Sequence, residues 1–155
     1  MKLNLLLAIF MLALLTHGCE IDHGLGVLGS KISGKVIFIN HDQKPDYVEA
    51  VRMAAVVDFD FSDISLSDAV LANTSVNLSR EISEYYIPAP LASYELIVAI
   101  WKQKGKAWNA TNWLGFYGYD PVNQTVEYKS VTLTEKDPVA ENINIYCDWS
   151  TIRPN

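Results

Sequence analysis

Aromatic side chains that could bind a ligand gather in one part of the chain. Five residues are the candidates: Trp101, Trp108, Trp113, Tyr117 and Tyr119. An aromatic ring can stack on the apolar face of a sugar while its N–H or O–H stays polar. Trp108 is the most suggestive, because its neighbours are polar and a strand face does not explain it. The alternative is that Trp101 and Trp113 pack the sheets together and that Trp108 folds over the edge.

Four acidic residues, Asp58, Asp60, Asp63 and Asp68, lie close together in sequence. Carboxylates gathered around one point can bind Ca²⁺. This run lacks the glycine and the closing glutamate of the helix–loop–helix calcium loop. Charges on a solvated sheet edge, which discourage strand-to-strand aggregation, explain it better. We therefore expect no metal site and no cofactor.

Histidines are scarce: after residues 1–18, only His23 and His41 occur. Neither belongs to a motif that supplies a nucleophile or a metal ligand. No G-x-S-x-G elbow and no Cys/His pairing is present. We expect no catalytic residue and no enzymatic activity.

The first residues have the order of an export signal. Lys2 gives a positive start, Leu5–Leu15 is an uninterrupted apolar run, and Gly18 and Cys19 follow after a polar step. The run is shorter than the roughly 20 residues of a membrane-spanning helix. We therefore expect residues 1–18 to be removed.

The end of this segment resembles a bacterial lipoprotein signal, in which a cysteine receives lipid and becomes the new N-terminus. Gly18 and Cys19 match that pattern, whereas Leu15 stands one place too early and His17 is unusually bulky. The resemblance implies lipid attachment at Cys19. The alternatives are an ordinary signal that leaves Cys19 as a thiol, or a disulfide with Cys147.

Charge and length bound the mature chain. The net charge is −6, and loss of the single positive charge of Lys2 makes it −7, which argues against nucleic acid as a partner. The remaining length suits one domain. We expect a signal peptide over 1–18, a glycine-rich tether over 19–30, a β-domain over 31–150 and a tail over 151–155.

Hydrophobic residues alternate with period two through most of the domain. The patterns predict about seven strands with turns every 8–12 residues, typical of an all-β antiparallel sandwich. The clearest hairpin is expected over Ile82–Trp101, with Pro88 ending its first strand. A helical turn near Ser67–Leu71 and a short strand near Ser75–Leu78 are expected between longer strands. Closing residues Ile143, Ile145, Cys147 and Trp149 alternate.

Short motifs in these strands resemble carboxypeptidase-regulatory-like and transthyretin-like domains. The opening strand carries Ile32-Ser33-Gly34-Lys35-Val36, the segment YYIPAPLASYELIVAI matches the family's most recognisable element, and Asn142–Ile145 resembles its last strand. Ser93 stands where a glycine is usual. The resemblance implies a seven-stranded, immunoglobulin-like sandwich that is mostly non-catalytic.

Together these features predict a lipid-anchored protein of the bacterial cell envelope, at the outer membrane or the periplasmic face. It would be secreted if Cys19 carried no lipid. The expected role is a structural or interaction module, with the membrane as one partner and envelope proteins or glycans as others. The alternative is a carbohydrate-binding module built around Trp108.

Overall fold

The computed structural model describes residues 29–60 and 69–153. These residues form twelve strands and two short 3-10 helices, η1 (His41–Gln43) and η2 (Trp149–Thr151). The strands are β1 (Lys31–Ile39), β2 (Val48–Val56), β3 (Ala69–Leu71), β4 (Ile82–Pro88), β5 (Ser93–Tyr94), β6 (Leu96–Gln103), β7 (Trp113–Phe116), β8 (Tyr119–Asp120), β9 (Thr125–Val126), β10 (Val131–Thr132), β11 (Val139–Ala140) and β12 (Ile145–Asp148). The predicted all-β class is confirmed. No helix within the described ranges is long and apolar enough to cross a membrane.

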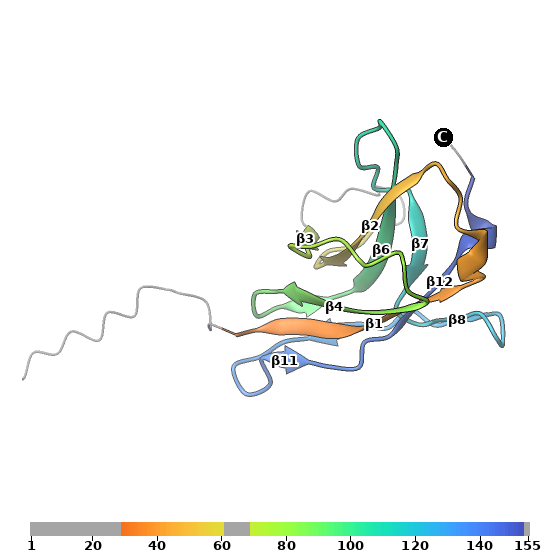
Figure 1. The fold of residues 1–155 in the computed structure, drawn as a ribbon. Helices are drawn as coiled ribbons and strands as arrows, with labels where there is room; N and C mark the ends of the chain where they lie inside the picture. Colours follow the sequence, from red (N-terminus) through yellow and green to blue (C-terminus); the bar gives the residue numbers. More distant parts are fainter. Residues whose placement is uncertain (1–28, 61–68, 154–155) are drawn as a thin grey trace, which may run out of the picture.

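β1 is the central strand of the first sheet. β4 pairs with it antiparallel, which places Ser33 opposite Tyr86 and Lys35 opposite Glu84. On its other side, β11 pairs in parallel with the start of β1 and β12 pairs in parallel with its end. The first and last strands are therefore neighbours, and β4, β1 and β11 form the lower layer in Figure 1.

The second sheet has the order β3-β2-β6-β7, and all its neighbours are antiparallel. It forms the upper layer in Figure 1. Two small pairs, β5 with β10 and β8 with β9, complete the fold. The two larger sheets pack around a shared core, in the manner of a β-sandwich.

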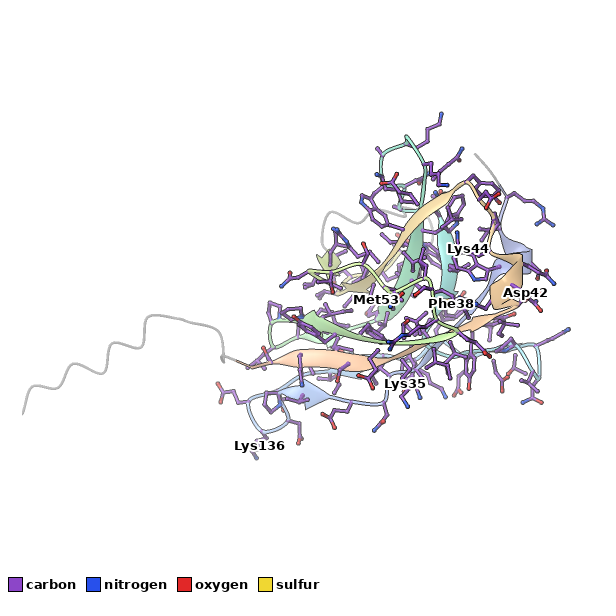
Figure 2. The ribbon with its side chains drawn as sticks, viewed as in Figure 1. Lys35, Phe38, Asp42, Lys44, Met53 and Lys136 are labelled. Atoms are coloured by element: carbon purple, nitrogen blue, oxygen red, sulfur yellow. The ribbon has the colours of Figure 1, made fainter. Side chains whose placement is uncertain are left out.

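Alternating side chains build this core. Ile32, Val36 and Phe38 of β1 are buried, whereas Lys35 is exposed. Figure 2 shows Phe38 and Met53 between the layers and Lys35 on the opposite side of β1. Complete burial of one such apolar side chain contributes roughly 1.5–3 kcal/mol. The predicted alternation of the closing strand is confirmed, because its four residues Ile143, Ile145, Cys147 and Trp149 are all buried.

The second sheet is apolar on both faces. Residues that alternate with its inward-facing side chains form a separate buried group, here called the outer cluster: Ala54, Val56, Leu96, Val98 and Ile100. β6 therefore contributes to the core on one face and to the outer cluster on the other. A strand buried on both faces reads as a continuous apolar run, as Leu96–Trp101 does.

β7 and β12 lie side by side and bring the two sheets together along one edge (Figure 1). A Cβ on Gly115 of β7 would overlap the carbonyl oxygen of Tyr146 in β12. The absence of a side chain at Gly115 allows this close approach of two backbones.

The hairpin predicted over Ile82–Trp101 is wrong. β4 pairs with β1, and β6 pairs with β2, so the two strands belong to different sheets. Alternation identifies each strand but not its partner. Pro88 ends β4 as predicted, and the chain then crosses from one sheet to the other.

Two smaller predictions between β2 and β4 also differ from the structure. Ala69–Leu71 is a strand and not part of a helical turn, while Ser67 and Asp68 lie outside the described residues. Residues 75–78 are not a strand. Val76 nevertheless donates its N–H to the carbonyl of Val51, so an irregular segment runs beside β2.

Candidate functional site

The five aromatic candidates do not form one group. Trp101 lies in the core with 2% of its surface exposed, and its ring centroid is 5.7 Å from that of Tyr47. Its ring is therefore enclosed by protein. The other four candidates divide between the outer cluster and a second pocket. These two places adjoin at Phe116, whose ring centroid is 5.9 Å from that of Tyr119.

Trp108 belongs to the loop between β6 and β7 and packs against the outer cluster. The guanidinium carbon of Arg52 lies 5.2 Å from the centroid of its ring, a cation–π distance. Asn109 shapes the loop, because its Oδ1 accepts the backbone N–H of Thr111 at 3.0 Å. An open pocket of about 420 Å³ lies here, lined by Trp108 and by polar side chains that include Gln103, Lys106 and Asn109.

Trp113 also packs against the outer cluster. Its Nε1 donates to the carbonyl of Ala110 at 2.7 Å, which fixes the ring to the preceding loop. Its centroid is 5.5 Å from that of Phe59 and 6.2 Å from that of Phe116. Phe59 follows the end of β2 at Val56 and packs against the outer cluster.

Tyr117 and Tyr119 line a second pocket, of about 340 Å³, together with Tyr146, Asn142 and Asn144. Neither Trp108 nor Trp113 contributes to its lining. The structure thus brings Trp108 and Trp113 to the outer cluster and Tyr117 and Tyr119 to the edge beside β12.

The acidic run and the histidines fall in different surroundings. Asp58 is exposed, and Asp63 and Asp68 lie outside the described residues, as does His23. Within residues 29–60 and 69–153, no group of three metal-binding side chains occurs. His41 lines an open pocket that also includes Asp42 and Glu81, and its Nε2 lies 3.0 Å from the carbonyl oxygen of Leu78.

Cys147 is a free thiol with no exposed surface. Burial raises the pKa of this thiol, so it stays protonated and unreactive at neutral pH. Cys147 therefore behaves as a small core residue. Cys19, the expected site of lipid attachment, lies outside the described residues.

A further pocket, of about 550 Å³, lies on the outer side of the first sheet and was not predicted from the sequence. It forms where the last strand is interrupted. Ile32 pairs with Ala140 and Val36 pairs with Ile145, so three residues of β1 face four residues, 141–144. This extra residue defines a β-bulge, here called the bulge.

Backbone and side-chain bonds hold the bulge in place. Ile143 donates its N–H to the carbonyl of Ser33 at 3.1 Å and accepts the hydroxyl of Tyr85 at 2.7 Å. Asn144 Oδ1 accepts the N–H of Lys35 at 3.0 Å. Asn142 has a left-handed backbone with φ of 61°.

Burial next to Tyr117 and Cys147 raises the pKa of Tyr85 strongly, so its hydroxyl remains a donor.

The alternation of Asn142-Ile143-Asn144-Ile145 did suggest a strand. The only sequence signals for the interruption are the left-handed tolerance of asparagine at 142 and the glycine at 34.

Comparison with family models, with curated proteins and with solved structures finds no match to this chain.

Proposed function

We propose that this chain is an exported lipoprotein of the bacterial cell envelope, anchored by lipid on Cys19. Its β-domain acts without catalysis, as a structural or interaction module. The observation that carries the proposal is the order of the first 19 residues: Lys2, the apolar run Leu5–Leu15, and Gly18 before Cys19.

The spacing between Cys19 and the domain supports this proposal. β1 begins at Lys31, so twelve residue steps separate the expected lipid from the first strand. An extended chain of that length reaches at most about 40 Å. This distance holds a domain close to a membrane surface while leaving its faces accessible to other molecules.

The proposed sandwich is immunoglobulin-like and resembles transthyretin-like domains. Its seven strands are β1, β2, β3, β4, β6, β7 and a last strand in which β11 and β12 are joined through the bulge. Two features support this topology: β11 and β12 pair in parallel with the same strand, and their registers differ by only one residue.

Fractionation of cells that express the full chain tests the anchor. The wild-type chain should sediment with membranes, and its mature N-terminus should carry the mass of attached acyl chains. Cys19→Ala should move the protein to the soluble fraction. Cys147→Ala is the matched control, because it removes the other cysteine and should stay with the membrane. Membrane retention of Cys19→Ala would refute the anchor.

A carbohydrate-binding module is the second candidate function. It is favoured by the pocket beside Trp108, where an aromatic ring and several polar side chains line one open space. A stacking site there predicts that Trp108→Ala abolishes binding and leaves the fold intact. Unchanged glycan binding by this variant would exclude Trp108 as the platform.

A further inference from the structure

We propose that the bulge and the adjacent outer face of the first sheet bind a neutral oligosaccharide. This site is separate from Trp108 and does not depend on the lipid anchor. It is formed by the pocket over β1 and β4 and by the pocket between the bulge and the β8–β9 pair.

The two pockets adjoin at the bulge. Asn142 and Asn144 line both of them. One pocket extends from these residues toward Tyr86 of β4, and the other extends toward Tyr119 of β8. The shape therefore suits an extended ligand that crosses the bulge, not a single compact molecule.

The lining has the chemistry of sugar recognition. Each asparagine side chain has an NH2 group that donates hydrogen bonds and a carbonyl oxygen that accepts them. This pair matches a sugar hydroxyl, which both donates and accepts. Tyr86 is 50% exposed and stands opposite Ser33, whose side chain is short. Tyr146 and Tyr119 provide further rings in the second pocket. Tyrosine stacks on apolar C–H faces through its ring and keeps its hydroxyl in water.

Charges around both pockets nearly cancel, which disfavours a strongly charged ligand. The pocket over β1 and β4 is lined by two cations, Lys31 and Lys35, and by two anions, Glu84 and Glu141. In the second pocket, Lys129 and Glu127 form an ion pair at 3.2 Å. Asp120 Oδ2 there accepts the amide of Asn123 at 2.8 Å. A neutral, hydroxyl-rich chain is the ligand that this balance fits.

Hydrogen bonds hold the bulge in its conformation without a ligand. The bonds from Ser33, Tyr85 and Lys35 fix its backbone and the side-chain oxygen of Asn144. A ligand therefore loses little affinity to the ordering of the site. Asn142 is exposed and keeps an uncommon left-handed conformation, as residues at binding sites often do.

Isothermal titration calorimetry on the full chain tests the proposal. The protein is purified in a zwitterionic detergent without a sugar headgroup, because glycosidic detergents would compete. The probes are cellohexaose, xylohexaose, mannohexaose and chitohexaose, with polygalacturonate as the anionic comparison. We expect at least one neutral hexasaccharide to bind.

Five variants locate the site. Tyr86→Ala and Asn142→Gly should each weaken binding by roughly tenfold; glycine at 142 preserves the left-handed backbone. Asn144→Asp keeps the acceptor for the Lys35 N–H and removes the amide donor, so it should also weaken binding. Val122→Ala is the control, because Val122 is exposed and lines neither pocket, so it should bind as the wild type does. Trp108→Ala distinguishes the two candidate sites: it should retain binding if the ligand binds at the bulge. Circular dichroism and melting temperature verify that each variant is folded.

Three results would overturn the proposal: no binding of any neutral probe at millimolar concentration, binding of polygalacturonate alone, or loss of binding in Trp108→Ala with retention in Tyr86→Ala and Asn142→Gly. The last result would instead support the Trp108 module. None of these outcomes bears on membrane anchoring, which the Cys19→Ala fractionation decides separately.

Discussion

Gly34 and Ile143 approach so closely that a side chain at position 34 would have no room. A Cβ built on Gly34 would overlap the carbonyl oxygen of Ile143 and lie 2.9 Å from its backbone nitrogen. This contact lets the bulge lie against β1 while Ile143 points into the core with 7% exposure. The shape of the outer face therefore depends on a glycine in the neighbouring strand.

Gly34→Ala should destabilise the domain by about 3 kcal/mol, because the new methyl group meets backbone atoms that cannot rotate away. Urea denaturation measures the change. Gly105→Ala is the control: unlike Gly34, Gly105 has a positive φ, of 72°, but no atom lies within 4 Å of its added Cβ. That variant should cost only about 1 kcal/mol. Equal effects of the two substitutions would show that the close approach is unimportant.

Tyr85→Phe removes the hydroxyl that donates to the carbonyl of Ile143. It leaves a buried acceptor without this donor, and we expect a loss of about 1–2 kcal/mol in the free energy of unfolding. Tyr86→Phe is the matched control one residue away, since Tyr86 is half exposed. Its effect should stay within about 0.5 kcal/mol. A stability change in Tyr85→Phe no larger than in the control would contradict a structural role for this bond.

Cys147 makes stability depend on alkaline pH. Its pKa is raised by burial in the folded state. The unfolded thiol loses its proton above roughly pH 8.5, whereas the folded thiol keeps it. The folded state then binds more protons, so stability falls by about 1.4 kcal/mol per pH unit.

Urea denaturation under reducing conditions at pH 7, 9 and 10 should show this decline in the wild type. Cys147→Ala loses stability at pH 7 through poorer packing but should have a much flatter profile between pH 9 and 10. Above pH 10, Tyr85 and Tyr94 add to the decline, because burial raises the pKa of both phenols. An equally steep decline in Cys147→Ala between pH 9 and 10 would exclude the thiol as its source.

The sequence predicts individual strands well because period-two alternation reports local burial. Ile32, Val36 and Phe38 face the core as their spacing indicates, and Pro88 ends its strand. Strand pairing depends on contacts that are distant in sequence. The apolar run Leu96–Trp101 therefore gave no indication that it pairs with β2 and not with β4.

The candidate site was harder to predict for a related reason. Trp101 and Trp108 are seven residues apart, but one is in the core and the other is beyond the outer cluster. Their burial differs because Trp101 lies in a strand and Trp108 lies in a loop; the residue type is the same. The bulge was missed because Asn142–Ile145 alternates like an ordinary strand. Its interruption becomes visible only when Ala140 and Ile145 are aligned with β1.

The four tryptophans should differ sharply in their accessibility to solvent. Trp101 and Trp149 are each 2% exposed, whereas Trp108 and Trp113 are partly buried. Acrylamide quenching of the native protein should therefore come mainly from Trp108 and Trp113. Trp108→Phe should lower the quenching constant and shift the emission maximum to the blue.

Two variants test the origin of this signal. Trp149→Phe should leave the quenching constant nearly unchanged, because acrylamide does not reach a buried indole. Arg52→Ala should increase the quenching assigned to Trp108, because the guanidinium lies over its ring and restricts access. If Trp108→Phe and Trp149→Phe change the quenching equally, Trp108 is as enclosed as the core tryptophans. A sugar could then not stack on its ring, and the outer face of the first sheet would be the remaining candidate site for glycans.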